Sequence, residues 1–184
     1  MKITITELWA KMTEIGLGGW IDVSEGEILK EEIEKLESGQ IYTEIGVAYG
    51  KSLATMCYYA KEGVNIYGID RLNWGQRDEN IQKLGIEPRH KFIEGDSQQE
   101  ALAWMESIDL LFIDADHLYD GVKKDLLSWV PHVKSGGVIM MHDYDSPTSP
   151  GVVQAVSNFI YPHNAYKDFK FPDRPNSIFR FTKK

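Results

Sequence analysis

Residues 108–143 read IDLLFIDADHLYDGVKKDLLSWVPHVKSGGVIMMHD, and this stretch decides the fold. Its first apolar run ends in Asp114, and an amphipathic segment of helical length follows. After a Gly-Gly turn, a second apolar run leads to Asp143. Short apolar runs that alternate with amphipathic helices are typical of a parallel β-sheet with helices packed against it. The stretch therefore predicts a strand–helix–strand unit of an α/β domain.

The same alternation extends in both directions along the chain. We expect strands at residues 41–45, 65–70, 90–95, 108–114 and 137–143. We expect the intervening and following helices at residues 52–63, 78–85, 97–105, 120–133 and 152–161. Two extended pieces at 166–171 and 177–183, separated by Pro172 to Asn176, predict a C-terminal antiparallel hairpin. These strands add up to a mostly parallel, doubly wound sheet of seven strands.

The segment before the first strand, residues 1–40, reads as two helices. Its second half, EGEILKEEIEKLESG at residues 25–39, is acidic and amphipathic. We expect this segment to form a helical cap in front of the main domain at residues 41–184. At 184 residues the whole chain fits one domain of ordinary size.

Composition narrows the class of ligand. The formal net charge is −8, and no basic stripe is present, so we expect a small-molecule substrate and no nucleic acid. No apolar run reaches the length of a membrane span, and the first residues lack the order of a signal peptide, which predicts a cytoplasmic protein without a membrane partner. The single cysteine, Cys57, excludes a disulfide framework within the chain.

Every one of the five predicted parallel strands ends in an acidic residue or is followed directly by one. In an open parallel sheet, ligands bind beyond the carboxyl ends of the strands. Acids are common in turns, so a single one carries little weight. Five at one edge of a sheet indicate a binding site. These acids are Glu44, Asp70, Asp96, Asp114 and Asp143.

A glycine-containing turn, EIGVAYGKS at residues 44–52, follows the first strand. Glycines allow the backbone to turn tightly and approach a ligand just before a helix begins. Its end resembles a phosphate-binding P-loop, but that loop needs glycine where Ile45 stands, and Gly46 comes one residue too late. A dinucleotide-binding turn needs glycine where Ala48 stands. Neither template fits.

Four motifs in this order resemble the class I S-adenosylmethionine-dependent methyltransferases. They are the E-x-G-x-x-x-G-x-S turn, the acid that ends the next strand, DLLFIDADHLYDGVKKDL, and SGGVIMMHDY. Within that class they are most similar to a small-molecule O-methyltransferase group related to macrocin O-methyltransferases and to a cephalosporin-biosynthesis protein. The resemblance covers about residues 40–145. It implies a Rossmann-like fold and methyl transfer to a small molecule, with a hydroxyl oxygen as the expected acceptor.

The resemblance also implies roles for individual residues. It assigns the loop at residues 44–50 to the methionine part of S-adenosylmethionine, Asp70 to the ribose hydroxyls, and Asp96 with Ser97 to the adenine. An ionised carboxylate accepts two hydrogen bonds and suits a vicinal diol. The expected cofactor-binding residues are Glu44, Gly46, Gly50, Ser52, Asp70, Asp96, Ser97 and Asp114.

Metal-dependent relatives place an acid at the positions of Asp114 and Asp143, so the resemblance predicts that these two carboxylates hold a divalent cation such as Mg²⁺. Those relatives carry Asn directly after the second acid, and here that residue is Tyr144. Asp145, His142 or His117 are the substitutes that the sequence offers for the third ligand. The metal therefore stays open at this point.

The alternative to a metal is a general base. His117 follows the fourth strand closely, and its ordinary pKa of ~6.5 suits proton removal from a substrate hydroxyl. We therefore expect His117 and Asp114 as catalytic residues, against the alternative that His117 only shapes its loop. Trp74, in the loop beyond Asp70, is the aromatic residue that we expect at the pocket.

Three questions remain open from the sequence. A nucleotide hydrolase with a shortened P-loop and a non-catalytic S-adenosylmethionine-binding module are the rival functions. A chain this close to a minimal core also suggests a homodimer, with each copy completing the other's pocket. The acceptor itself is not named by any motif.

Overall fold

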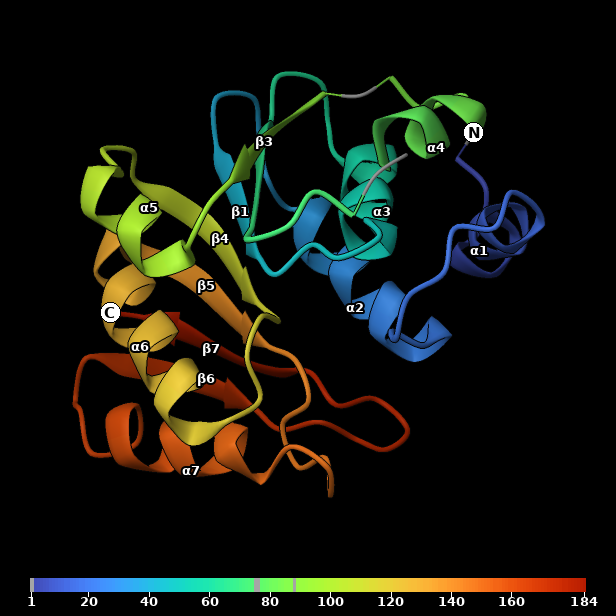
Figure 1. Ribbon diagram of the computed structural model, residues 1–184. Helices are drawn as coiled ribbons and strands as arrows, with labels where there is room; N and C mark the ends of the chain where they lie inside the picture. The colour runs from blue at the N-terminus through green and yellow to red at the C-terminus, as the bar shows by residue number, and fades with distance from the viewer. Residues whose placement is uncertain (1, 75–76, 88) are drawn as a thin grey trace.

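The structure, a computed structural model, describes residues 2–74, 77–87 and 89–184. A central sheet of seven strands carries helices on both faces (Figure 1). The strands are β1 (Ile41–Ile45), β2 (Asn65–Asp70), β3 (His90–Glu94), β4 (Ile108–Ile113), β5 (Val133–Met141), β6 (Tyr166–Lys170) and β7 (Phe179–Lys183). The helices are α1 (Ile5–Glu14), α2 (Val23–Ile33), α3 (Lys51–Tyr59), α4 (Arg77–Lys83), α5 (Ser97–Ala103), α6 (Tyr119–Trp129) and α7 (Pro150–Phe159), with a 3-10 turn η1 (Val130–His132).

The strand order is β3-β2-β1-β4-β5-β7-β6, and β1 to β5 run parallel to one another. β7 pairs antiparallel with β5, and β6 pairs antiparallel with β7. The predicted Rossmann-like sheet and its C-terminal hairpin are therefore confirmed. The order reverses between β1 and β4, so the carboxyl ends of these two strands border the crevice where ligands bind in such sheets.

Two hydrophobic cores cover the two faces of the sheet. Because side chains alternate along a strand, Leu110 and Phe112 of β4 pack toward α1 to α4, whereas Leu111 and Ile113 pack toward α5 to α7. All six residues of β4 are buried, as expected for a central parallel strand. Both cores fix the position of β4 and hence of the acid that follows it.

The expected boundaries around β5 were wrong. The predicted helix at residues 120–133 ends at Trp129, since Pro131 cannot continue it and forms part of η1 instead. β5 then begins at Val133, four residues before the predicted start, and pairs first with Ile108. The strand ends at Met141, so His142 and Asp143 lie in the turn beyond it.

The N-terminal helices pack on the same face as α3. Each begins with a capping box, Thr4 with Glu7 in α1 and Asp22 with Glu25 in α2. Trp9 of α1 donates a hydrogen bond from its ring nitrogen to Thr55 of α3 at 3.0 Å. Among the described residues, no helix has both the length and the apolar character that a membrane crossing requires.

Candidate functional site

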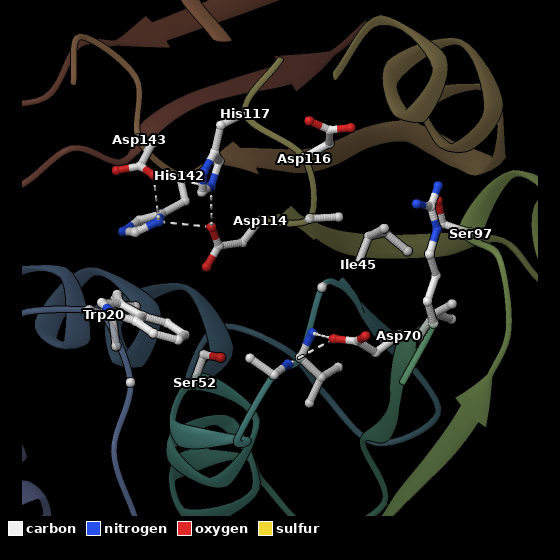
Figure 2. A pocket seen from close by; sticks show the side chains of 18 of the residues that line it. Trp20, Ile45, Ser52, Asp70, Ser97, Asp114, Asp116, His117, His142 and Asp143 are labelled. Carbon is white, nitrogen blue, oxygen red and sulfur yellow. Dashed lines mark hydrogen bonds and ion pairs between the residues drawn. The ribbon is translucent and has the colours of Figure 1, made fainter. Parts of the chain in front are cut away.

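A pocket of about 920 Å³ lies at the carboxyl ends of β1, β2 and β4. Its lining also includes the loop before α2, with Trp20, and the turn after β5, with Asp143 (Figure 2). Its size falls in the range of sites that hold a cofactor or a small ligand. The pocket therefore lies at the carboxyl ends of the parallel strands, the edge of the sheet where the sequence predicts a binding site.

The turn after β1 comes very close to the end of β4. Gly46 has a φ of +87°, and a Cβ atom placed on it would lie 2.4 Å from the carbonyl oxygen of Asp114. Both the backbone angle and the contact exclude a larger side chain. The loop at residues 46–50 consequently lines the floor of the pocket, together with Ser52 at the start of α3.

Asp70 ends β2 and lines the pocket. Its Oδ2 atom accepts hydrogen bonds from the backbone N–H groups of Val47 at 2.9 Å and Ala48 at 2.8 Å. Its Oδ1 atom accepts a third, at 3.0 Å, from Leu72 N–H. Asp70 therefore holds the glycine turn against β2, and its Oδ1 atom retains an acceptor site for a ligand hydroxyl.

We expected Glu44 to line the pocket. It lies beneath the glycine turn instead and is not part of the pocket lining. Its side chain is fully buried, where it accepts hydrogen bonds from Ser52 Oγ and, at 2.7 Å, from the Tyr42 hydroxyl. Burial raises the pKa of Glu44 to about 8 in spite of these two hydrogen bonds. The carboxyl group therefore fixes Ser52 from below, and burial favours its neutral form.

Asp96 also lies outside the pocket lining, whereas the adjacent Ser97 lies within it. Asp96 caps α5 by accepting from Gln98 N–H at 3.1 Å, and it forms an ion pair with Arg71 at 3.0 Å. Asp125 of α6 takes its place at this end of the pocket and accepts from Ser97 Oγ at 2.6 Å. The sequence offered no signal for Asp125, because a buried acid on a helix resembles an exposed one.

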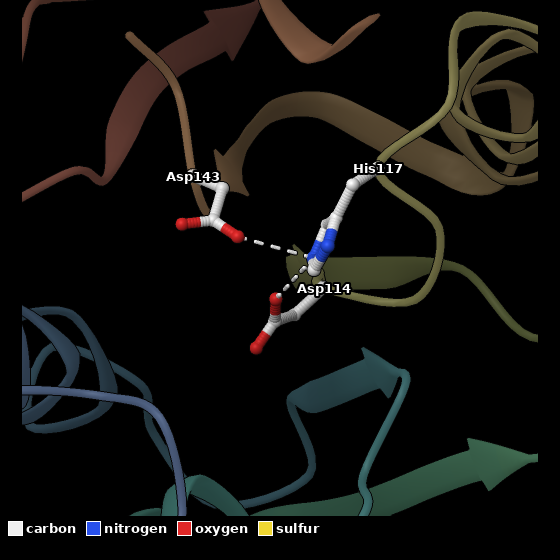
Figure 3. Close-up of side chains that lie close together, drawn as sticks. All are labelled: Asp114, His117 and Asp143. Atoms are coloured by element: carbon white, nitrogen blue, oxygen red, sulfur yellow. Dashed lines mark ion pairs between the residues drawn. The ribbon is translucent and has the colours of Figure 1, made fainter. Parts of the chain in front are cut away.

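At the opposite end of the pocket, Asp114, His117 and Asp143 face one another (Figure 3). His117 Nε2 lies 3.1 Å from Asp143 Oδ2 and 3.7 Å from Asp114 Oδ1. His117 is about half exposed, so its ring is open to the cavity. The structure thus brings together all three residues that the sequence singled out as catalytic or metal-binding.

The two carboxylates change the acid–base properties of His117. The pKa of His117 is raised above its ordinary value of 6.5, mainly by its interaction with Asp114. The charge of Asp143 adds to this shift, and partial burial opposes it. The pKa of Asp114 is lowered, because its interactions with His117 and His142 outweigh the effect of burial. The pair therefore favours an imidazolium ion next to a carboxylate.

A second histidine supports Asp114 from behind. His142 is buried and makes a hydrogen bond between Nδ1 and Asp114 Oδ1 at 2.8 Å. Its Nε2 atom lies 3.3 Å from Glu25 of α2, which is also buried. Burial alone would lower the pKa of His142, but the interactions with Asp114 and Glu25 raise it to about 11. Sequence analysis missed Glu25, whose only visible signal was a capping-box pattern with Asp22.

Stability should depend on pH through this buried ion pair. The pKa of His142 rises from 6.5 to about 11 on folding, so its contribution is complete below about pH 6.5 and is lost as the pH rises toward 11. The pKa of Glu25 falls from 4.5 to about 2, because His142, Ser177 and Asp22 outweigh burial, so that contribution is lost as the pH falls below 4.5. We expect the difference in unfolding free energy between the wild type and His142→Gln to be largest between pH 4.5 and pH 6.5, where both contributions are complete. Urea titrations at about pH 5.5 and about pH 9 measure it, and an equal difference at both values would contradict the assignment.

The residues that the sequence offers as a third metal ligand differ in their distance from Asp114 and Asp143. Asp114, His117 and Asp143 each offer one atom, all within 4.8 Å of one another. Tyr144 is buried, and its hydroxyl pairs with Tyr161 at 2.6 Å. Asp145 is exposed, interacts with Arg174, and does not line the pocket. Of the substitutes considered, His117 is therefore the one that lies beside both carboxylates with its ring open to the pocket.

Three aromatic rings line one wall of the pocket. Trp20 and Tyr49 have ring centroids 5.9 Å apart, and Tyr49 and Trp74 lie 5.2 Å apart. Trp20 is 77% exposed, an unusual state for so large an apolar side chain. The prediction that Trp74 lies at the pocket is confirmed, and a bound ligand would cover apolar surface here.

Comparisons with known proteins agree with this architecture. A family model for a methyltransferase domain matches residues 43–144. An uncharacterized protein of Acanthamoeba polyphaga mimivirus is 34% identical over 143 residues, which cover 71% of this chain and 64% of the relative. An uncharacterized protein of Sinorhizobium fredii is 30% identical over 117 residues, which cover 54% of this chain and 12% of the relative. The chain thus spans less than two thirds of either relative.

Solved structures share the fold at low sequence identity. An O-methyltransferase from Bacillus cereus, in complex with S-adenosylhomocysteine, is 15% identical with a TM-score of 0.71 and covers 98% of this chain and 90% of its own. The O-methyltransferase TomG from Streptomyces achromogenes, in complex with S-adenosylmethionine, is 14% identical with a TM-score of 0.70. The match covers 97% of this chain and 88% of TomG. The family match extends over more than half of the chain and includes the β1 turn, Asp70, Asp114 and Asp143. The chain belongs to the methyltransferase domain family.

Proposed function

We propose that the protein transfers a methyl group from S-adenosylmethionine to a hydroxyl oxygen of a small molecule. The observation that carries this proposal is the position of His117 between two carboxylates at one end of a pocket whose other end is formed by the glycine turn and Asp70. The family match supports methyl transfer, and the pocket geometry supports the acceptor class.

The cofactor fits the chemistry of the pocket lining. Its methionine part would lie along the loop at residues 46–50, a ribose hydroxyl would donate to Asp70 Oδ1, and its adenine would reach Ser97. The lining is rich in acids, which favours the sulfonium and ammonium charges of S-adenosylmethionine. These acids are Asp70, Asp114, Asp116, Asp125 and Asp143.

The reaction needs alignment and the removal of one proton. The acceptor oxygen attacks the methyl carbon in line with the C–S bond, which breaks to leave S-adenosylhomocysteine, while the hydroxyl proton passes to His117 Nδ1, because Nε2 faces the two carboxylates. Asp114 and Asp143 stabilise the imidazolium ion that forms. We therefore assign His117 as the general base and Asp114 as its partner.

A divalent cation would use the same side chains. Asp114 and Asp143 would supply oxygen ligands and His117 a nitrogen ligand, and the cation would lower the pKa of the acceptor hydroxyl. A histidine ligand is unusual for Mg²⁺ and common for transition metals. Since one Asp114 oxygen already pairs with His142, we favour His117 as a base.

The test of the proposed function uses methyl-labelled S-adenosylmethionine and a panel of phenols, sugars and other hydroxyl compounds. We expect the label on an oxygen of at least one compound. Label on nitrogen or carbon acceptors alone would contradict the acceptor class. Binding of S-adenosylmethionine without transfer to any compound would favour the non-catalytic module.

Asp70 should contribute to both cofactor affinity and loop order. Asp70→Ala removes a charged acceptor worth about 1.5–3 kcal/mol, so we expect affinity for S-adenosylhomocysteine to fall about tenfold to a hundredfold. The melting temperature should also fall, because Val47 and Ala48 N–H lose their acceptor. Calorimetric titration measures the affinity. Asp96→Ala, which changes a neighbouring acid outside the pocket lining, is the matched control, and equal losses in both variants would contradict a ribose contact.

A further inference from the structure

Glu25 lies in the first turn of α2, just after the pocket-lining loop that contains Trp20, and it is buried. As the third residue of a capping box it needs one contact, the hydrogen bond from Asp22 N–H to Oε2 at 2.9 Å. The corresponding residue of α1, Glu7, makes such a cap at the surface. Glu25 has additional partners at the ends of two different strands, which capping does not explain.

The first partner connects Glu25 with Asp114. Glu25 Oε2 lies 3.3 Å from His142 Nε2, and His142 Nδ1 lies 2.8 Å from Asp114 Oδ1. Both Glu25 and His142 are about 5% exposed, so water does not screen this interaction. The imidazole ring therefore connects α2 with the carboxylate at the end of β4, through an ion-pair distance without hydrogen-bond geometry on one side and a hydrogen bond on the other.

The second partner connects Glu25 with Asp143. Glu25 Oε1 accepts hydrogen bonds from Ser177 N–H at 2.8 Å and from Ser177 Oγ at 2.6 Å. The same Ser177 Oγ accepts from Asp143 N–H at 3.2 Å, and the Ser177 carbonyl accepts from Tyr144 N–H at 2.9 Å. Ser177 therefore holds the backbone of the turn after β5 on both sides of the Asp143 carbonyl.

This support matters because the turn is strained. Asp143 has a φ of 55°, in the left-handed region that a residue with a side chain rarely adopts. Such a conformation persists only where the surroundings hold it. In it, the Asp143 carboxylate reaches His117 Nε2 at 3.1 Å.

We propose that Glu25 is a positioning residue that fixes both carboxylates beside His117, Asp114 through His142 and Asp143 through Ser177. It touches neither cofactor nor acceptor in this role, and the inference builds on the proposed function. A displacement of about 1 Å at a reacting group costs about a hundredfold in rate. The N-terminal segment would then act on turnover through one buried side chain.

The test compares Glu25→Ala, Glu25→Gln and Glu7→Ala. Glu25→Ala removes both connections, so we expect kcat for the best hydroxyl acceptor of the panel to fall about a hundredfold, with KM for S-adenosylmethionine within about twofold of wild type. Glu25→Gln keeps an Oε1 acceptor for Ser177 but loses the ion pair with His142, and we expect it to restore part of kcat. Glu7→Ala removes only a cap and should lower the melting temperature without changing kcat.

Crystal structures of the same variants with S-adenosylhomocysteine give a readout that needs no acceptor. In Glu25→Ala we expect Asp143 to leave the left-handed region and its distance from His117 to increase, while in Glu25→Gln only the contact between His142 and Asp114 should change. Unchanged positions of both carboxylates in Glu25→Ala, or a kcat equal to that of Glu7→Ala, would overturn the proposal. Failure of the wild type to bind S-adenosylhomocysteine would contradict the proposed function instead, and structures of the free variants would still decide the role of Glu25.

Discussion

Replacement of His117 by alanine is expected to lower turnover by a factor of about 10²–10⁴, the range that a positioned general base contributes. The ring stands between Asp114 and Asp143 at the pocket, and its half-exposed side chain contributes little to the core. The melting temperature and the affinity for S-adenosylhomocysteine should therefore stay close to wild type. Steady-state kinetics with an acceptor from the panel measure the effect.

The pH profile distinguishes a base from a loop-shaping residue. Only neutral His117 accepts a proton, and its pKa lies above 6.5, so wild-type turnover should rise as the pH increases through that raised value. His132→Ala, which changes a histidine of η1 on the other side of the domain, is the matched control. A His117→Ala enzyme with unchanged turnover and an unchanged pH profile would rule out the assigned base.

Asp114→Ala is expected to lower turnover as much as His117→Ala does, and also to destabilise the fold. The carboxylate is the shared partner of His117 and His142. Without it the buried His142 cation keeps Glu25 at 3.3 Å and Asp143 at 3.9 Å, and removing one member of a buried ion pair costs about 3 kcal/mol. Turnover should fall about 10²–10⁴-fold because His117 loses one of the two carboxylates that stabilise its imidazolium ion. Urea unfolding and kinetics measure the two effects separately.

A chelator decides what Asp114 does in the reaction. With His117 as the base, EDTA should leave the turnover of the wild type unchanged, and Asp143→Ala should keep measurable activity through Asp114. If a cation is required, EDTA should abolish turnover and leave the affinity for S-adenosylhomocysteine intact. Loss of activity with EDTA that Mg²⁺ or Mn²⁺ restores would replace the assigned base with a metal site.

Much of the fold was predictable because its signals are local. Buried strands such as β4 read as continuous apolar runs. The helix predicted for residues 52–63 is present as α3, although it ends at Tyr59, before the predicted stop at Gly63. The β5 boundary was not predictable in the same way. Residues 134–136 are polar or small and interrupt the apolar run, and the strand begins before them because Val133 pairs with Ile108 of β4.

In the candidate site, too, the residues with local sequence signals were predictable and those with distant partners were not. Asp70, Asp114 and Asp143 were identifiable because parallel strands bring their carboxyl ends to one edge. The position of Asp96 was not, because a residue that caps a helix and one that faces a ligand look alike in sequence. Glu25 and Asp125 depend on side chains that lie 152 and 28 residues away, which no local pattern contains.

Calorimetric titration of the purified protein with S-adenosylhomocysteine, and separately with ATP and Mg²⁺, tests the central claim most directly. The glycine turn at residues 46–50, Asp70 and the acid-rich lining together predict one-to-one binding of S-adenosylhomocysteine and none of ATP. A higher melting temperature with the first ligand alone should accompany it, since a ligand that binds only the folded state stabilises it. Binding of ATP with Mg²⁺ in the absence of any binding of S-adenosylhomocysteine would contradict the account and favour a nucleotide hydrolase.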